Sequence, residues 1–415
     1  MGKLEVIVIG AGTGGLALTH GLRAAGISTR VFERDRNLTE RVQGYRLTIN
    51  ANGAQALQSC LPRANFEHYI AASAMVSTAV SFLDHRLRRL FSVDVPANGQ
   101  SAPYAARPIS RVSLRMILAE GLENVVTFGK TFQSFEKMPD GRVIAHFEDG
   151  SSAEGDVLVG ADGAASRVRG QLLPQARRVD TGIFMVSGKL PLDAAVRRET
   201  PPPIFKGPTL ILGSRGCCMF TGAVEYPPGH PPAYDREEYV TWGFSAHQDS
   251  FELAREDGEM ASANAKAAVL GQMPDWSSDL RRLVERADAS SLTSFVVKSS
   301  VPIAPWPTCC VTLLGDALHN MTPFRGIGAN TALRDAALLR DTLVRVDTGE
   351  RDLLVALADY ERSMIDYGFA AVRASLANMK RVHARSPVGR LGTKAFFRLA
   401  DASPWLRRRL IDSGG

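Results

Sequence analysis

The pattern of apolar and polar residues near the N-terminus predicts a β-α-β unit. Residues 4–9 form a short, largely apolar run, which is typical of a parallel strand buried on both faces. A helix is expected over residues 14–25, because Gly26 follows as a stop signal, and a second strand over 29–32. Dinucleotide-binding α/β domains begin with this order of elements.

The turn after the first strand carries Gly10-x-Gly12-x-x-Gly15. Gly10 makes the tight turn, Gly12 lets the backbone approach a pyrophosphate, and Gly15 lets the helix pack on the strand. Glu33 ends the second strand 18 residues after Gly15, at the position where an acid accepts hydrogen bonds from ribose hydroxyls. An acid here argues against a 2′-phosphate, so the sequence predicts a dinucleotide other than NADP.

Three later segments combine a strand or helix with residues suited to bind a ligand. A strand over 156–160 runs into a turn at Asp162-Gly163, and a helix near 109–118 contains Arg111. A strand over 310–314 precedes Asp316. The loop after it carries Pro323, Gly326 and Gly328, and a helix is expected to begin near Ala329.

The stretches between these motifs predict a second, β-rich domain. Apolar and polar residues alternate at strand lengths over 79–83, 87–93, 183–190, 209–212, 217–223, 239–245 and 294–300. Helical patterns fall near 248–257, 261–272 and 277–287, and the tail over 351–410 is predicted to form helices ending at Gly389, at Pro404 and at the Arg407-Arg408-Arg409 cluster. The predicted fold is α/β: a Rossmann-like domain, a second β-sheet-rich substrate domain and C-terminal helices.

Composition limits the possible functions further. The net charge of +6 and pI near 9.1 favour anionic substrates or NADPH but fall short of a nucleic-acid signature. No apolar run reaches about 18 residues, so no transmembrane helix is expected, and the chain enters a strand at once, leaving no room for a signal peptide. The five cysteines and eight histidines form no metal-spaced set. A reducing cytoplasm is the expected location.

Taken together, the four motifs resemble those of the FAD-dependent aromatic hydroxylases, the para-hydroxybenzoate hydroxylase-like class A flavoprotein monooxygenases. The resemblance spans roughly residues 4–345 and departs at Ile327, where the family usually has Gln between the two glycines. It implies a glutathione-reductase-type FAD-binding domain, with NADPH or NADH and O2 as transient co-substrates. That domain is expected in three pieces, 1–72, 101–176 and 299–345, with a substrate-binding domain over 73–100 and 177–298 and a helical segment over 346–415.

The resemblance and the side-chain chemistry assign roles within the site. Arg111 is expected to reach the FAD phosphates, and Asp316 to accept a hydrogen bond from a ribityl hydroxyl. The helix N-terminus near Ala329 is expected to stabilise the negative charge of reduced flavin, and His319 to order the loop. The residues expected to bind the cofactor are Gly10, Gly12, Thr13, Gly14, Gly15, Glu33, Arg34, Arg46, Arg111, Asp162, Gly163, Asp316, Pro323, Gly326, Gly328, Ala329 and Asn330.

Two residues are candidates for the reaction itself. Family members often place an arginine just after the second strand, which suggests Arg46, within residues 41–46, as a cation beside the isoalloxazine ring. Pro323 is the other candidate. An exposed loop arginine remains an alternative for Arg46, and a surface helix charge remains one for Arg111. The sequence identifies no catalytic base.

The expected activity follows from the resemblance. NADPH or NADH reduces FAD, O2 forms a flavin C4a-hydroperoxide, and an electron-rich substrate carbon is hydroxylated or epoxidised. The substrate is a small molecule, aromatic or polycyclic, from aromatic catabolism or natural-product biosynthesis, and the enzyme a monomer or homodimer. Two alternatives stay open: a flavin-dependent dehydrogenase or reductase on the same fold, and a non-catalytic FAD-binding protein.

Two segments outside the motifs have alternative interpretations. The proline-rich stretch 226–234 excludes a helix or central strand, and it forms either a rim of the substrate pocket or a surface connection between strands. The tail contains Phe396, Phe397, Trp405 and a cluster of arginines. It forms either a membrane-surface helix or, as we expect, a helix packed on its own domain with a solvated basic face.

Overall fold

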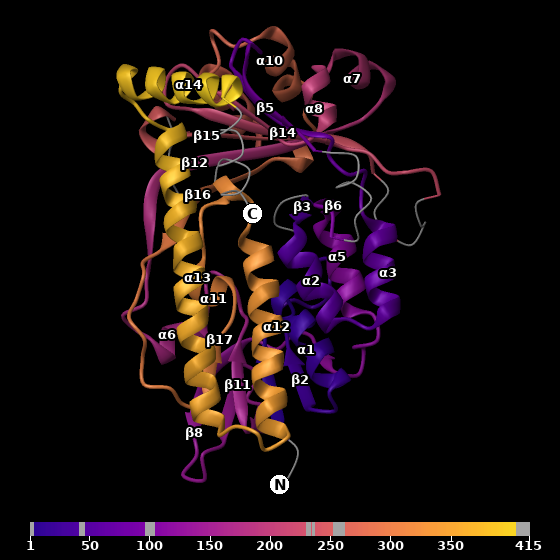
Figure 1. Cartoon of the computed structure of the whole chain (residues 1–415), viewed down its shortest axis with the longest axis vertical. Helices are drawn as coiled ribbons and strands as arrows, with labels where there is room; N and C mark the ends of the chain where they lie inside the picture. Colours follow the sequence, from indigo (N-terminus) through magenta and orange to yellow (C-terminus); the bar gives the residue numbers. More distant parts are fainter. Residues whose placement is uncertain are drawn as a thin grey trace.

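The computed structural model describes residues 4–40, 46–95, 104–229, 234, 237–251 and 262–403. Its centre is a five-stranded parallel sheet, here called sheet A, with the strand order β17-β11-β1-β2-β7. β1 (Glu5–Ile9) lies between β2 (Ser28–Phe32) and β11 (Val157–Gly160), and the outer strands are β7 (Val126–Thr127) and β17 (Val311–Leu313). Sheet A therefore joins strands from the beginning of the chain and from about 300 residues later in one sheet, with β11 between β1 and β17 (Figure 1).

Apolar side chains of sheet A are buried between helices and a small antiparallel sheet. The helices that share this core are α1 (Thr13–Ala24), α2 (Ala51–Cys60), α3 (Arg63–Ala72), α5 (Arg111–Ala119), α6 (Arg167–Leu172), α12 (Gly328–Asp347) and α13 (Leu353–Val382). The small sheet consists of β8 (Phe132–Lys137), β9 (Val143–Phe147) and β10 (Ser152–Gly155). A two-stranded ladder of β3 (Arg46–Ile49) and β6 (Arg107–Ser110) lies above α2 and α5 (Figure 1).

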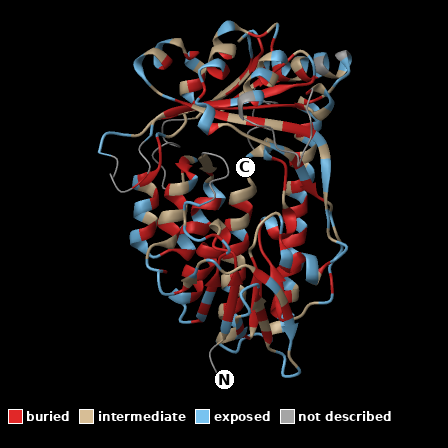
Figure 2. Ribbon diagram, turned by 180° about the vertical axis from the view of Figure 1, so that it is seen from behind, coloured by how far each residue is buried: buried red, intermediate tan, exposed pale blue. Residues whose placement is uncertain are grey.

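A second, seven-stranded sheet, here called sheet C, lies across the top of the molecule (Figures 1 and 2). Its strand order is β16 (Thr293–Ser300), β12 (Arg178–Pro191), β15 (Tyr239–His247), β14 (Cys218–Val224), β13 (Thr209–Leu212), β4 (Ala79–Asp84) and β5 (Arg89–Asp94). All neighbours are antiparallel except β13 and β4.

Alternation along β15 divides sheet C into two faces. Val240, Trp242 and Phe244 are buried against α9 (Ser262–Gly271) and α10 (Ser278–Glu285) in the upper core. The intervening residues point to the opposite face, which looks down on the rest of the molecule (Figure 1). Shorter helices α7 (Ala194–Glu199) and α8 (Pro202–Lys206) and the 3-10 turns η1 (Gln248–Ser250) and η2 (Ala289–Ser291) complete this part.

The C-terminal helices join the two sheets. α13 runs the height of the molecule, and α14 (Pro387–Ala402) packs on sheet C, where Phe397 stacks on Phe82 with ring centroids 4.5 Å apart (Figure 1). The predicted end at Gly389 is wrong, because Gly389 lies in the first turn of α14. Ser386 caps this helix and Pro387 is its first residue, a Ser-Pro pair that favours a helix start.

The other strand and helix predictions agree closely with the structure. The exceptions are the strand predicted over 183–190, which begins earlier at Arg178 and has an irregularity between Asp180 and Ile183, and the helix predicted over 248–257. There the chain forms only the short η1 before it turns extended at Phe251, and residues 252–261 lie outside the described residues. None of the described helices is both long and apolar enough to span a membrane.

Candidate functional site

The three glycines after β1 differ in how closely the protein surrounds them. Gly10 has a φ of +109°, and a Cβ there would lie 2.5 Å from the carbonyl oxygen of Ala161. At Gly15 a Cβ would lie 2.2 Å from the oxygen of Gly10, so glycine lets α1 pack closely. A Cβ at Gly12, in contrast, would meet no atom within 4 Å. Gly12 precedes α1 without a side-chain cap, so the helix N-terminus opens onto free space of the kind that binds phosphate.

Glu33 and an unpredicted arginine hold the loop beside this helix terminus. The Glu33 carboxylate accepts hydrogen bonds from the backbone N–H of Ala11 at 2.7 Å and of Asp35 at 3.0 Å. Arg115 lies 3.5 Å from Glu33 and 3.2 Å from Asp35. A carboxylate accepts up to about four hydrogen bonds, so Glu33 retains capacity for ribose hydroxyls. Arg34 instead has a largely exposed side chain.

Arg115 was missed by the sequence interpretation, although a signal for it exists. It stands one helical turn after Arg111 in α5, and residues four apart share a helix face. Arg115 also donates to the carbonyl oxygens of Ala11 at 3.3 Å and Leu38 at 3.0 Å. It therefore orders the loop that carries Glu33.

Asp316 and Arg111 carry opposite charges that lie near each other. Both side chains are exposed to solvent, while desolvation by nearby protein raises the pKa of Asp316 and lowers the pKa of Arg111. The charge of Arg111 and that of Arg178 in β12 oppose the pKa shift of Asp316, so the three groups face one another. These three residues, with Gly328 beside Asp316, are called the Asp316 cluster below.

The segment that follows Asp316 leads back to the Asp316 cluster at Gly328. It forms the short α11 (Asp316–His319) and η3 (Pro323–Arg325), turns at Gly326 with a φ of +64°, and enters α12 at Gly328. A Cβ at Gly328 would lie 3.9 Å from Oδ1 of Asp316, and one at Gly326 would meet no atom within 4 Å. Pro323 is exposed at the start of η3. α12 has no side-chain cap, so Gly328 and Ala329 present a second open helix N-terminus.

The side chain of Asn330 binds other parts of the protein rather than pointing to the Asp316 cluster. It is buried, donates to the carbonyl oxygen of Thr48 at 2.9 Å and accepts from the backbone N–H of Asn50 at 2.9 Å. These bonds fasten α12 to β3 and α2. Only the backbone N–H of Asn330 therefore remains for the predicted contact with a cofactor.

A buried hydrogen-bond network around Asp335 holds the segment that follows Leu314 in place. Asp335 of α12 accepts hydrogen bonds from the backbone N–H of Gly315 at 2.7 Å and from the hydroxyl of Tyr367, and it pairs with His319 at 2.6 Å. Burial lowers the pKa of His319, but the Asp335 carboxylate outweighs it and raises the pKa overall. This is the loop-ordering role predicted for His319.

The Asp162-Gly163 turn lies against the glycine turn, since Gly10 contacts Asp162 directly. Oδ2 of Asp162 accepts from the backbone N–H of Arg167 at 2.8 Å, which orients α6, while Oδ1 is buried without a partner. Gly163 has a φ of +73° and open space beside it. Arg169 connects this turn to α11 through the oxygen of Ala317 at 2.7 Å.

The two helix termini from opposite ends of the chain adjoin each other. Thr13 begins α1, and at Gly14 a Cβ would lie 2.3 Å from Leu314 and 3.2 Å from the oxygen of Ala332 in α12. Arg46 lies apart from both: its guanidinium is placed against β14 of sheet C, 5.8 Å from the ring centre of Phe220. The rest of the segment 41–46 that carries Arg46 lies outside the described residues.

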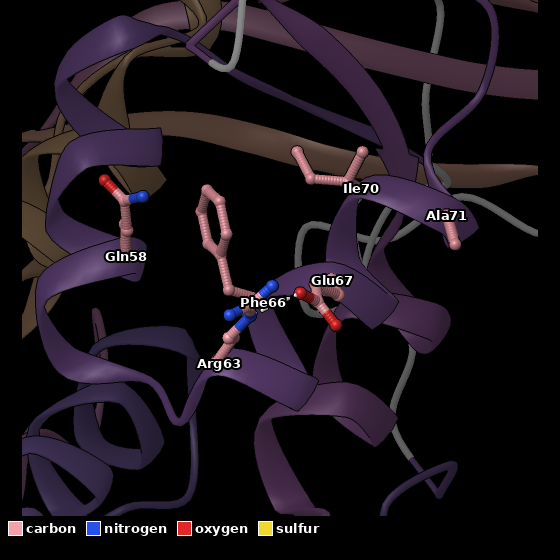
Figure 3. A pocket seen from close by; sticks show the side chains of 6 residues that line it. All are labelled: Gln58, Arg63, Phe66, Glu67, Ile70 and Ala71. Carbon is pink, nitrogen blue, oxygen red and sulfur yellow. Dashed lines mark hydrogen bonds and ion pairs between the residues drawn. The ribbon is translucent and has the colours of Figure 1, made fainter.

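A separate surface hollow on α2 and α3 contains none of the predicted site residues (Figure 3). Phe66 points into it between the two helices, and Arg63 and Glu67 form an ion pair at its edge with a distance of 2.7 Å. The other lining residues are Gln58, Ile70 and Ala71. No group for redox or acid–base chemistry converges there, so we assign it no function.

Comparison with known proteins identifies the class. The family model described as "FAD binding domain" matches residues 3–197 and 288–375. A solved structure of a putative FAD-containing monooxygenase from Photorhabdus luminescens is 34% identical, with a TM-score of 0.82, and the match covers 92% of this chain and 99% of that one. The chain belongs to the para-hydroxybenzoate hydroxylase-like family of FAD-dependent flavoproteins.

Two relatives show the range of lengths in the family. The dual O-methyltransferase/FAD-dependent monooxygenase elcB of Phaeosphaeria nodorum is 33% identical over 372 residues, which cover 81% of this chain and 40% of the relative. The chain thus spans less than half of that protein. The FAD-dependent monooxygenase phnB of Penicillium herquei is 28% identical, and the match covers 92% of this chain and 91% of phnB. FAD is accordingly the cofactor of this protein.

Proposed function

We propose that this protein is an FAD-dependent monooxygenase that uses NADPH or NADH and O2 to hydroxylate or epoxidise an electron-rich organic molecule. One observation carries the proposal: two uncapped helix N-termini, those of α1 and α12, adjoin each other beside the Asp316 cluster. Oriented N–H groups of this kind suit both a pyrophosphate and an anionic reduced flavin. The relatives named as FAD-dependent monooxygenases support the reaction class.

The open positions fit an extended FAD. Space without protein atoms at Gly12 and Gly163 suits the pyrophosphate, while Glu33 suits the adenosine ribose. Asp316 suits the ribityl chain, and the open space at Gly326, next to Gly328 and Ala329, suits the ring. When bound, FAD accepts a hydride from the nicotinamide and activates oxygen. The protein orients both partners, excludes water and stabilises the changing charge.

The substrate would lie between the ring and the lower face of sheet C. Phe220 and Phe295 expose 39% and 41% of their surface there, although most large apolar residues are buried. Residues 316–328, which follow β17 and would lie beside the flavin ring, are here called the flavin segment. Its Phe324 packs into clusters on that same face, with Cys218 in one and Met185 in the other. Exposed aromatic rings beside a cofactor site mark a binding surface for an aromatic or polycyclic substrate. We also propose that the chain is divided as the sequence predicts, into an FAD-binding domain in three pieces, a substrate-binding domain over 73–100 and 177–298, and a C-terminal helical segment.

The first test is reduction of the protein-bound flavin. Purified protein supplied with FAD should bind about one equivalent, and a screen of phenols, indoles and polycyclic aromatics should find compounds that accelerate NADPH or NADH oxidation. Protein that does not bind FAD would contradict the proposal, and bound FAD that no nicotinamide reduces would support a non-catalytic FAD-binding protein instead. Cytoplasmic location and a monomer or homodimer remain part of the proposal, checked by fractionation and by light scattering.

A further inference from the structure

The guanidinium of Arg46 is partly buried and, among the described residues, has no counter-ion. Its Nη2 atom is closed to solvent and has no hydrogen-bond partner. Across the residues that the structure describes, no carboxylate lies within ion-pair distance of it, whereas Arg115 has both Glu33 and Asp35. An uncompensated charge that protein partly desolvates is unfavourable, and a ligand of opposite charge would offset this cost.

Sheet C is shaped around this side chain. A Cβ at Gly222 in β14 would lie 2.7 Å from Nη2 of Arg46, so glycine leaves the space that the guanidinium occupies. The Phe220 ring, two residues earlier on the same face, lies 5.8 Å from the guanidinium carbon and remains partly exposed. Arg46 therefore stands beside an aromatic surface that is open to a substrate.

The strand that carries Arg46 connects this surface to the flavin segment. Arg46 begins β3, and the carbonyl oxygen of Thr48, two residues on, accepts the hydrogen bond from Asn330 in the first turn of α12. Two residues of strand span about 7 Å. Arg46 thus lies at the border between the ring site and sheet C, with its guanidinium on the substrate side.

We propose that Arg46 binds an anionic oxygen of the substrate, either a carboxylate or an ionised phenol or enol, and so selects acidic aromatic compounds. This rests on the proposed monooxygenase function and names the substrate class for it. A guanidinium pairs with a carboxylate through two parallel hydrogen bonds. With a phenol, the same charge favours the ionised form, whose ring is more electron-rich at the carbon to be oxygenated. Desolvation, which lowers the pKa of Arg46, would strengthen such a pair.

The test measures binding to the FAD-loaded protein without turnover. Perturbation of the flavin spectrum is titrated with 2-naphthoate, with uncharged 2-naphthol at neutral pH, and with 2-naphthol at rising pH. In the unaltered protein, naphthoate should bind at least about tenfold more tightly than neutral naphthol if the anion is a carboxylate. If the anion is a phenolate, binding of naphthol should tighten as the pH rises.

Variants assign the effect to Arg46. Arg46→Met should abolish the preference for the anion while neutral naphthol binds as before, and Arg46→Lys should retain part of it. Arg362→Met, at a largely exposed arginine on α13, is the matched control. The proposal would be overturned if Arg46→Met and the unaltered protein prefer the anionic compound to the same extent. It would also be overturned if neither protein prefers the anionic compound. Loss of FAD from Arg46→Met would also overturn it and make Arg46 a flavin ligand. A failure of oxygenation would not alter these binding results.

Discussion

Asp316 carries a charge that the surrounding protein penalises and that Arg111 and Arg178 partly compensate. Such an arrangement is stable when a ligand accepts or donates the remaining hydrogen bonds, which the ribityl hydroxyls of FAD would do. Asp335, in contrast, is fully paired below the segment. The sequence assigned a role only to Asp316, because the partners of Asp335, Gly315, His319 and Tyr367, are brought to it by the packing of α11 and α13 on α12.

Replacement of Asp316 tests the first of these roles. Asp316→Asn should weaken FAD binding by about 1–3 kcal/mol, the usual cost of a lost charged hydrogen bond. Fluorescence titration of the FAD-free protein gives the affinity, and Asp341→Asn, at a largely exposed aspartate on α12, is the control. An unchanged affinity in Asp316→Asn would show that the carboxylate does not touch FAD.

At the scale of elements, the sequence predicted most strands and helices because their periodicity is local. Glu33 was expected to serve ribose alone, whereas it also binds backbone N–H groups and Arg115. Asn330 was expected at the cofactor, yet its side chain fastens α12 to β3. Such contacts depend on how α5, α12 and β3 pack, and packing across distant segments leaves no periodic signal. Phe324, which connects the flavin segment to sheet C, was missed for the same reason.

A substitution at the N-terminus of α12 can distinguish an effect on FAD binding from an effect on protein stability. A Cβ at Gly328 would meet its nearest protein atoms, in Met321 and Asp316, only at 3.8 Å and 3.9 Å. Gly328→Val should therefore keep the thermal stability of the FAD-free protein while lowering the flavin reduction potential or ejecting FAD. Gly170→Val, at a helical glycine with open space around it, is the control. Full FAD occupancy with an unaltered potential in Gly328→Val would show that this terminus does not contact the ring.

α13 contains a buried acid that should make stability depend on pH. Burial raises the pKa of Glu361 to about 7, and its carboxylate accepts from Thr308 at 2.7 Å. The pKa of Glu361 is higher in the folded protein than in the unfolded chain, so folding favours the protonated side chain. The contribution of Glu361 to the free energy of unfolding is therefore fully present below pH 4.5 and is lost as the pH rises to about 7. The loss should reach roughly 3 kcal/mol.

The neutral variant Glu361→Gln should remove this dependence. Denaturant unfolding at pH 5 and pH 8 should show a smaller fall in the free energy of unfolding for the variant than for the unaltered protein. If the free energy of unfolding falls equally in the two proteins between pH 5 and pH 8, the pKa of Glu361 is not raised in the folded protein.

At the scale of the whole molecule, two sheets face each other across the flavin segment, and the nicotinamide must reach the ring from outside. The described residues include no second glycine-rich dinucleotide turn of the β1–α1 kind. Oxygen chemistry nevertheless needs a closed, dry site. Both demands are met if the ring, or the segment that covers it, moves between an exposed and a buried position, and the open space at Gly326 would permit this.

Gating of this kind predicts substrate-dependent reduction. Stopped-flow reduction by NADPH should be slow without substrate and at least tenfold faster with it, a bias of about 1.4 kcal/mol between the two positions. An inert aromatic that does not bind is the control. Equal rates with and without the true substrate would mean that the ring is permanently accessible.

The fate of molecular oxygen tests the central claim most directly. A compound that accelerates nicotinamide oxidation is incubated with the FAD-loaded enzyme under ¹⁸O2, and the product is examined by mass spectrometry. The account predicts one ¹⁸O atom in each product molecule. Nicotinamide consumption without any label in the product would contradict it and identify the protein as a flavin-dependent reductase or dehydrogenase.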